Sequence, residues 1–542
     1  MDGTPLCATV SDPAIASVDS KLDDLCREIA DKYAEICALE RQKRELLSQR
    51  NALLPIFQQD VAIHFQICQF LQEPGELSPS VRAISQTCRA WREMVLEMPL
   101  LWTFIQLGAG YRKLAWGREV LKRSKGCPLY LNYIKKAPST LPSYEVRIDT
   151  HQFFTDCIRD PGRIKSLSVH VQSLYHQEPD ECTQILECIG TSPACLESLW
   201  VHIDHHSGSN RLPEVLLRCA PPRLRSLSLK NYQAVWTSSL MCASLTQLEI
   251  ISPTVKLSLN RVVESLRQLP LLEALHLTDC ITPDVHHFNV LETQRQAFAL
   301  PRLRKFKTES PSPFIAYMYL AIRYPPTTQV DLKITTRFHI ESTAQIYWAF
   351  AAILSGFTPL ELQLGLKITE RHFLTEISLV DNVMGTKLCS LKVASSLPQD
   401  AIAIIWSGLP KSRIVSITSD IESTTAAWWM GLLNLDRVHS ITVSFSIAPF
   451  LTSSAPTSFT AEEDGEPSSP PPFPVLANLH LESVKLHKCD QSGSRIISML
   501  LGWLEGRVLC GLALEKLTLR RCDPFLGDLD SLGDLIGEVV DE

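Results

Sequence analysis

Hydrophobic and polar positions change their spacing twice along the chain, which divides it into three zones. In the first, residues 19–54, apolar residues recur at alternating three- and four-residue steps, which predicts one helix beginning at a Ser20–Asp23 cap. The apolar seam is interrupted by Lys32, Lys43 and Arg50. Two interpretations stay open, namely an amphipathic helix lying on the rest of the protein and a homodimeric coiled coil. The seam comprises Leu22, Leu25, Ile29, Ile36, Leu39, Leu46 and Leu53.

The second zone, residues 55–107, has a helical pattern with two sharp interruptions. The run from Asp60 to Leu71 predicts a short buried helix capped by Asp60, and prolines and a glycine end it within "QEPGELSP". Apolar residues from Val81 to Met98 then form one continuous helical face, which must stop at Pro99. The following "LLWTFIQL" predicts a strand. That helical face comprises Val81, Ile84, Cys88, Trp91, Val95 and Met98.

The third zone, residues 163–522, repeats a short unit of the form L-x-x-L-x-L, which predicts a strand at each occurrence. Examples are "LESLWV" at Leu196, "LRSLSL" at Leu224 and "LEKLTL" at Leu514. Intervals such as "LNRVVESLRQLP" and "SRIISMLLGWLEGR" predict helices. Alternating strands and helices of this period are typical of a leucine-rich-repeat solenoid with parallel strands. Further units begin at Ile164, Leu245, Leu272, Leu388, Val438 and Leu476, and less regular ones at Leu303 and Ile414.

In such a strand the leucines point into the solenoid, and the residues between them face outward on a concave sheet. The outward set is chemically mixed, which suits a protein ligand better than a nucleic acid. We therefore expect a target protein to bind there. The candidate binding residues are Ser228, Glu249, His276, Lys392 and His480, with Thr442 and Thr518 in equivalent places.

Composition narrows the function classes. The 542 residues carry a formal net charge of −7, which disfavours binding to a phosphate backbone. A content of 45% hydrophobic and 20% charged residues is that of a globular protein of several domains. Neither a signal peptide nor an apolar run long enough to cross a bilayer is evident. The 17 cysteines lack any C-x-x-C pair, so we expect reduced thiols in a cytoplasmic or nuclear protein.

Positive evidence for catalysis, cofactors or metals is absent from the sequence. There is no phosphate-binding glycine loop, no G-x-S-x-G and no H-E-x-x-H, so we expect a protein without enzymatic activity or cofactor. No cysteine or acidic cluster completes a four-ligand zinc set around either of two histidine clusters, and we expect exposed loop histidines with no metal. These clusters are His202, His205 and His206, and His286 with His287.

The segment "ISQTCRAWREMVLEMPLLWTFIQL" resembles an F-box of the form found in large fungal F-box-like families, which pair a V-x-x-V-C-+-x-W-R helix with P-x-L-W-x-x-I-x-L. The downstream "VLKRSKGCPLYLNYI" is similar to the piece that opens their solenoids. One departure concerns the first helix, which usually begins L-P-x-E. Here Phe57, Gln58 and Asp60 stand where leucine, proline and glutamate are expected.

The resemblance implies a substrate-recognition subunit of a Skp–cullin–F-box ubiquitin ligase. The F-box would dock the Skp adaptor, and through it the cullin, while the repeats bind an unknown protein target. Neither nucleic acid nor membrane is an expected partner. The alternative is a leucine-rich-repeat scaffold that does not assemble into a ligase. The candidate adaptor-binding residues are Phe57, Val61, Phe65, Cys68, Leu71 and Trp91, although a tryptophan on an apolar helical stripe is more often core.

The predicted fold class is therefore α/β, with an N-terminal helix, a small three-helix F-box-like module and an α/β solenoid. The predicted order is a disordered N-terminus at 1–18, a coiled-coil-like helix at 19–54 and the F-box-like domain at 55–107. A linker and the start of the solenoid follow at 108–162, then the solenoid itself at 163–522, with a disordered loop at 452–474. The acidic residues 523–542 are a terminal cap or a tail.

Overall fold

A computed structural model of the chain divides into two compact units, residues 1–132 and 133–542. The structure describes residues 13–70, 79–108, 114–135, 152–153, 155–171, 186–187, 189, 194–204, 211–219, 221–233, 236, 238–282, 297–310, 316–334, 347, 350–351, 354–355, 364–371, 374–385, 387–393, 399–421, 427–454, 472–489, 495–522 and 526–541.

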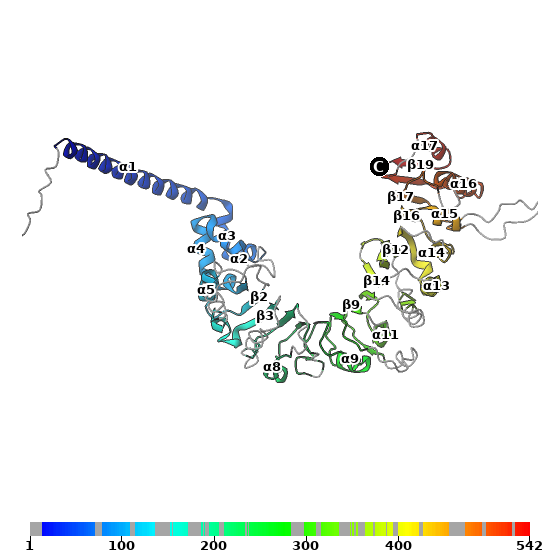
Figure 1. The fold of residues 1–542 in the computed structure, drawn as a ribbon, viewed down its shortest axis with the longest axis horizontal. Helices are drawn as coiled ribbons and strands as arrows, with labels where there is room; N and C mark the ends of the chain where they lie inside the picture. Colours follow the sequence, from blue (N-terminus) through cyan, green and yellow to red (C-terminus); the bar gives the residue numbers. More distant parts are fainter. Residues whose placement is uncertain are drawn as a thin grey trace, which may run out of the picture. The chain divides into compact units, whose positions relative to one another are not determined.

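The first unit begins with a single long helix, α1 (Pro13–Ala52), none of whose residues is buried (Figure 1). The predicted helix is present but starts earlier than expected, since residues 13–18 are helical rather than disordered and Ser20 lies inside the helix. Pro13 is a natural first residue because a helix leaves its first N–H groups unpaired. The rest of the predicted disordered terminus lies outside the described residues.

Three short helices follow a 3₁₀ turn, η1 (Pro55–Gln58). They are α2 (Val61–Phe70), α3 (Pro79–Thr87) and α4 (Arg89–Glu97). Asp60 caps α2 as expected, its Oδ1 accepting a hydrogen bond from the Ala62 N–H at 2.8 Å. The predicted continuous helix across Val81 to Met98 is wrong, because the backbone at Cys88 is extended (φ −154°, ψ 172°) and separates α3 from α4.

Trp102 joins the end of the helical module to the strand and helix that come next in the chain. The predicted strand "LLWTFIQL" is in its first half a 3₁₀ turn, η2 (Pro99–Trp102), and only then a strand, β1 (Phe104–Gly108). Trp102 is 2% exposed, donates from Nε1 to the Val95 carbonyl at 2.8 Å and packs 5.5 Å from the Trp116 ring. Trp116 belongs to α5 (Leu114–Arg123). Trp102 is therefore a core residue.

Strand β2 (Leu129–Lys135) follows α5 in the chain. The Tyr130 N–H of β2 donates a hydrogen bond to the Thr103 carbonyl at 2.9 Å.

The second unit is a large, open and mostly parallel sheet. Strands β3 to β7 pair in chain order and all run parallel, followed by β9 and β11. At the other end, β15 to β19 again pair in chain order. The bounds are β3 (Ile164–Val171), β4 (Ser198–Ile203), β5 (Ser226–Lys230), β6 (Gln247–Ile251), β7 (Ala274–Thr278), β9 (Lys305–Ser310), β11 (Gln329–Ile334), β15 (Ile414–Ile421), β16 (Ser440–Phe445), β17 (Asn478–Glu482), β18 (Lys516–Arg520) and β19 (Glu538–Asp541). Every L-x-x-L-x-L unit lies on one of these strands or on β14.

The middle of the sheet departs from the expected all-parallel order. Strands β12 (Leu364–Arg371), β13 (Leu374–Asp381) and β14 (Lys387–Val393) form an antiparallel meander. β14 pairs in parallel with β11, and β12 pairs in parallel with β15. The spatial order is therefore β11–β14–β13–β12–β15. The prediction of parallel strands is wrong for β13, which runs against both of its neighbours.

A left-handed residue directly follows five of these strands. Asn231, Ser252, Asp279, Ser483 and Arg521 directly follow β5, β6, β7, β17 and β18, and each has φ between 46° and 60°. Their N–H groups extend the ladder, as when Asn231 donates to the Ile251 carbonyl at 2.9 Å and Ser252 to the Thr278 carbonyl at 2.7 Å. The strands therefore end in a recurring turn as well as beginning with a recurring pattern.

Helices lie along one side of this row of strands, as Figure 1 shows for α9, α11 and α13 to α16. α9 (Leu259–Leu266) and α16 (Ile496–Leu509) fall where helices were predicted. The leucines of each strand are buried on this side, Leu227 and Leu275 being 1% exposed. Among the described helices, none is long and apolar enough to cross a membrane. The other short elements are η4 (Pro161–Arg163), α8 (Glu214–Arg218), α11 (Ala316–Ala321), α13 (Gln399–Ser407), η7 (Lys411–Arg413), α14 (Ala427–Met430), α15 (Ala448–Ser454) and the pair β8 (Phe298–Ala299) and β10 (Ile322–Arg323).

The C-terminal residues continue the sheet. α17 (Leu526–Gly533) and β19 follow β18, and Leu532 and Ile536 are buried. Of the predicted disordered loop at 452–474, residues 452–454 belong to α15 and 455–471 lie outside the described residues. Where the chain is described again, a buried arginine holds it. Arg507 donates to the carbonyls of Pro472 (3.1 Å), Phe473 (3.2 Å) and Leu476 (3.3 Å).

Candidate functional site

The side of the sheet without leucines presents a row of polar and aromatic residues on β3 to β7. The strand register places Trp200, Ser228, Glu249 and His276 side by side on β4, β5, β6 and β7. A second row two residues further on begins with His170, His202 and Lys230. We call the residues of both rows, together with Asp204 just after β4, the polar ladder. It comprises His170, Trp200, His202, Asp204, Ser228, Lys230, Glu249 and His276. Residues paired in this way share one face of the sheet because successive side chains alternate sides.

Hydrogen bonds link the centre of the polar ladder into a chain. The His202 Nε2 lies 2.7 Å from the Ser228 Oγ, which donates to the Glu249 Oε2 at 2.5 Å. The His276 Nδ1 donates to the other Glu249 oxygen at 2.6 Å. The chain runs across four neighbouring strands and fixes the rotamer of each member. Side chains held in this way lose little conformational entropy when a partner binds.

The carboxylate at the centre is held in its charged form. The hydrogen bond from His276, with a further one from Ser228, lowers the pKa of Glu249 to about 2, against the opposing effect of burial. Burial lowers the pKa of His202, so this ring is neutral at neutral pH. The polar ladder therefore combines a fixed negative charge at Glu249 with a neutral imidazole at His202.

A second acidic centre lies beside the first. Asp204 accepts from the His170 Nε2 at 3.0 Å and from the Lys230 Nζ at 2.7 Å. Burial would raise the pKa of Asp204, but these two hydrogen bonds outweigh burial and lower it. Its charge is thus compensated within the polar ladder.

An exposed tryptophan stands at one end. The Trp200 residue is 42% exposed, and its ring stacks on that of His202 at 6.1 Å with an interplanar angle of 27°. Its Nε1 donates to the Ser226 Oγ at 3.3 Å. A large, rigid and partly exposed ring beside fixed polar groups is the typical composition of a protein-interface hot spot.

The arrangement gives no support to nucleophilic catalysis by Ser228. In a serine–histidine–acid triad the histidine stands between the hydroxyl and the carboxylate. Here Ser228 occupies the central place, is 2% exposed and donates its proton to a carboxylate of low basicity. A buried hydroxyl of this kind is a structural link.

The predicted target-binding residues fall in three places along the sheet. Ser228, Glu249 and His276 are brought together in the polar ladder. Lys392 lies on β14, beside Lys333 in the register and 3.9 Å from carboxylate oxygens of Asp331 and Glu376. The residue His480 is half-buried on β17 between Thr442 and Thr518.

Residues missed from the sequence complete the polar ladder, namely His170, Trp200, Asp204 and Lys230. His202 was expected to be an exposed loop histidine, and this is wrong, because His202 is half-buried on β4. The signal was available for Trp200, because in "LESLWV" it occupies the place that Ser228 has in "LRSLSL". Within the described part of the chain, no group of three or more His, Cys, Asp or Glu residues is placed to hold a metal ion. His205, His206, His286 and His287 lie outside it.

The predicted adaptor-binding residues lie in the first unit. Phe57 belongs to η1, and Val61, Phe65 and Cys68 to α2, whereas Leu71 lies outside the described residues. Phe65 is half-buried. Trp91, on α4, is also half-buried and meets the His64 ring edge to face at 5.4 Å. Among the large apolar side chains of α2 that the structure describes, the exposed one was not predicted; it is Ile63, whose residue is 41% exposed.

Comparisons with known proteins identify no relative, so a functional conclusion depends on the geometry of the polar ladder and of α2. No family model matches the chain, and no curated protein is detectably similar to it.

Proposed function

We propose that this chain is the substrate-recognition subunit of a Skp–cullin–F-box ubiquitin ligase, with the helical module of the first unit docking the adaptor and the sheet of the second binding a target protein. The observation that carries the proposal is that one chain has two separate surfaces suited to protein contact. One is α2 with its exposed Ile63, and the other is the polar ladder with Trp200. Its catalytic contribution would be positional, since a ligase of this class brings a target lysine close to a bound E2.

The recurring turns support assignment of the second unit to the leucine-rich-repeat class. The repeat consensus continues after its strand as L-x-x-L-x-L-x-x-N/C. Cys280 and Cys522 occupy that last place in "LEALHLTDC" and "LEKLTLRRC". Both thiols donate back to backbone carbonyls, Cys280 to Ile250 at 3.1 Å and Cys522 to Leu481 at 3.4 Å. The side-chain thiol thereby joins the turn to the preceding strand, which is a physical reason for the consensus.

Adaptor capture tests the first half of the proposal. The full-length protein is expected to co-purify with a Skp adaptor and cullin, and Ile63→Asp to reduce capture at least tenfold because it places a charge in an apolar contact. The matched control is Leu100→Asp, which alters another exposed apolar residue (52%) on η2 of the same unit. If the Ile63→Asp variant captures the adaptor as well as the wild type does, α2 is not the docking surface.

The scaffold without ligase assembly is favoured by one observation. Asp60, which stands where the family has glutamate, is already used to cap α2 through the Ala62 N–H. If the full-length protein captures no adaptor under conditions in which another F-box protein does, the ligase assignment is wrong and the scaffold remains.

Target binding is tested on the sheet. Trp200→Ser is expected to remove the specific partner from affinity-purified material identified by mass spectrometry, while Val215→Ser keeps it. Val215 is 47% exposed on α8, so the control also removes an exposed apolar side chain of the second unit. Equal loss from both variants would contradict a binding role for the polar ladder.

A further inference from the structure

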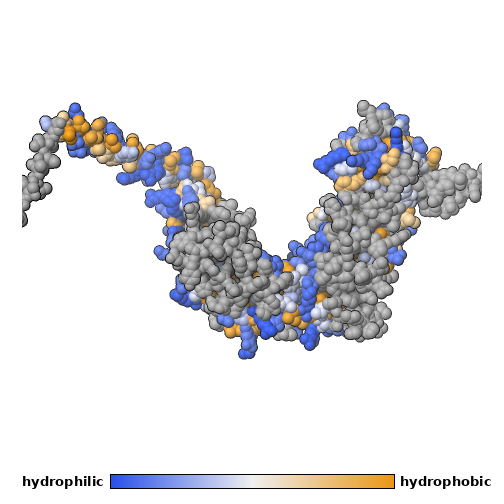
Figure 2. Space-filling model, viewed as in Figure 1, coloured by the Kyte–Doolittle hydropathy of each residue, from blue (hydrophilic) through white to orange (hydrophobic). Residues whose placement is uncertain are grey.

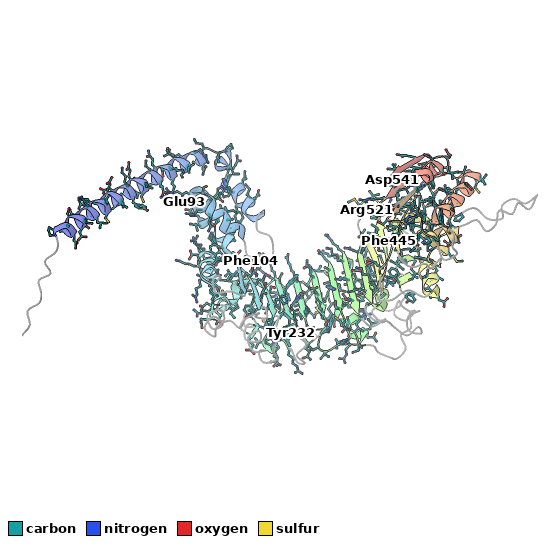
Figure 3. All side chains as sticks on the ribbon, turned by 45° about the horizontal axis from the view of Figure 1, so that its top comes forward. Glu93, Phe104, Tyr232, Phe445, Arg521 and Asp541 are labelled. Carbon is teal, nitrogen blue, oxygen red and sulfur yellow. The ribbon has the colours of Figure 1, made fainter. Side chains whose placement is uncertain are left out.

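Helix α1 approaches α4 and η1, but no described part of the chain packs along the length of its apolar seam. It has 40 residues and buries none of them, and Figure 3 shows its side chains projecting away from the backbone along the helix. Its apolar seam is more than half exposed, with Leu25 and Ile29 at 55% and Leu39 at 59%. Orange and blue residues alternate along it in Figure 2. Because most helical stability in water comes from packing an apolar face, such a helix requires a partner.

The seam has the composition of a two-stranded coiled coil. Since the helix starts at Pro13, the heptads extend back to Ile15 and Val18, both more than half exposed. Isoleucine then dominates the first apolar position of each heptad and leucine the second. This distribution favours two strands over three or four. The first position is filled by Ile15, Leu22, Ile29 and Ile36, and the second by Val18, Leu25, Leu39, Leu46 and Leu53.

Charge decides the orientation of the two strands. In a parallel dimer in register, Lys32, Lys43 and Arg50 would each face its own copy, which places like charges together at three layers of the seam. The flanking positions would add a fourth repulsion, because Glu35 of one helix would lie beside Glu40 of the other. Parallel pairing is thus disfavoured by the residues that interrupt the seam.

An antiparallel pair removes the like-charge contacts within the seam. In the register that sets Ile29 against Leu39, Lys43 faces Leu25, Lys32 faces Ile36 and Arg50 faces Val18. Almost the whole helix overlaps in this register, from Ile15 opposite Leu53.

Each cation of the seam then lies near an acid of the other helix. Glu28 is one turn from Leu25, Glu35 is next to Ile36, and Asp19 is next to Val18. Long basic side chains can keep their charged ends at the edge of such an interface.

We propose that α1 pairs with α1 of a second copy of this chain as an antiparallel two-stranded coiled coil in that register. The inference does not depend on the ligase assignment, because it concerns only the self-association of the first unit. Its consequence is a dimer in which two recognition surfaces are carried by one particle.

A pair of charge variants tests both the dimer and its orientation. Ile29→Lys with Leu39→Lys sets lysine against lysine in the antiparallel register, and the full-length protein is expected to shift from twice the chain mass of 60.8 kDa to that mass in light scattering. Ile29→Glu with Leu39→Lys sets glutamate against lysine and is expected to stay dimeric. Neither variant touches a residue that the protomer buries, so loss of folding does not confuse the result.

The same two variants separate the other arrangements. A parallel dimer would be broken by both, because each would place like charges together. If the variant with Ile29→Lys and Leu39→Lys remains a dimer, the interface lies elsewhere in the chain. If the wild type is a monomer at tens of micromolar, α1 binds another protein instead. Each of these results would overturn the proposal. Adaptor capture by the Lys–Lys monomer is measured separately and is expected to be unchanged.

Lysine cross-linking supplies a second measurement on the unaltered protein. Lys21 and Lys43 are 22 positions apart on one straight helix, which is about 33 Å at 1.5 Å per residue. In the proposed register, Lys43 of one copy faces Leu25 of the other, four residues from Lys21. A cross-linker reaching about 15 Å is therefore expected to join Lys21 to Lys43 only between copies. Absence of this product from the dimer fraction would reject the antiparallel register.

Discussion

Glu249 makes the stability of the polar ladder depend on pH. An unfolded glutamate has a pKa of about 4.3, and the fold lowers the pKa of Glu249 to about 2. Its contribution to stability is therefore fully present above about pH 5 and is lost as the pH falls through about 4 toward 2. We expect Glu249→Gln to lower the free energy of unfolding at neutral pH by roughly 1–3 kcal/mol, measured by urea denaturation, and the difference from wild type to shrink steadily below pH 5.

Glu264→Gln is the control for this comparison, since Glu264 is exposed on α9. It is expected to match the wild type at every pH. A deficit in Glu249→Gln that is the same at pH 7 and pH 3 would mean that shape rather than charge is responsible.

Phe445 stores backbone strain at the end of β16. Its φ is 67°, although its side chain gives it none of the local hydrogen bonds that let asparagine adopt this conformation (Figure 3 labels the residue). It is also 44% exposed, so little packing is lost on replacement. We expect Phe445→Asn to raise the free energy of unfolding by about 1 kcal/mol, measured by urea denaturation. Phe445→Ala keeps a Cβ without a local hydrogen bond, and an equal gain from it would contradict the explanation.

Single residues differ in how well their place in the structure can be predicted from the sequence. Ser228, Glu249 and His276 could be chosen because each lies between the last two apolar positions of its repeat, and the parallel register then brings them together. Arg507 could not be chosen, because three of its carbonyl partners belong to a segment more than thirty positions earlier. A long-range contact to backbone leaves no side-chain pattern to read.

At the scale of elements, close approach around Gly408 links α13 to the helical segment that contains Ala351. A Cβ at position 408 would overlap the backbone of Ala351 at its carbonyl, and backbone atoms cannot move aside as a flexible side chain can. We expect Gly408→Ala to destabilise the protein by about 2–3 kcal/mol in denaturant titration, as overpacking in a closed site does.

Gly502 provides the matched control because it lies within α16 with nothing within 4 Å of an added Cβ. Gly502→Ala is expected to be neutral or to stabilise by up to about 1 kcal/mol through helix propensity. Equal effects of the two substitutions would show that packing at Gly408 does not matter.

Elements were predictable where the hydrophobic period is local and misread where pairing is not. The helical period runs unbroken through Cys88, so the pattern does not reveal the extended backbone that separates α3 from α4. Strand β13 alternates apolar and polar residues like its neighbours, and direction is not encoded in that alternation. The choice between parallel and antiparallel pairing depends on which strand edge is open when β13 arrives.

At the scale of the whole molecule, the last elements cover β18, the last strand of the repeats. Leu532 is fully buried on α17, and the Gly537 N–H bonds to the Leu514 carbonyl at 3.2 Å just before β19. Without this cover β18 becomes an edge strand with its hydrogen-bonding groups unpaired, and such an edge recruits other chains. We expect Leu532→Asp to release the C-terminal elements and to cause soluble aggregates in size-exclusion chromatography.

Gly533→Asp adds the same carboxylate one position later, where nothing lies within 4 Å of an added Cβ. It is expected to elute as the wild type does. Aggregation of both variants would point to added charge on α17, rather than to an uncovered edge, as the cause.

The rearranged order of β11 to β15 constrains how the sheet can assemble during synthesis. In a simple solenoid each new strand docks on the one made just before it, so the structure can grow as the ribosome releases the chain. Here β11 pairs with β14, which is synthesised after β12 and β13. The Ser390 hydroxyl on β14 donates to the Asp331 carboxylate on β11 across a separation of 59 residues. Growth from the N-terminal side must therefore pause at β11 until the whole β12–β14 meander has emerged. A nascent chain arrested shortly after residue 371 should expose an uncovered strand edge that chaperones can bind.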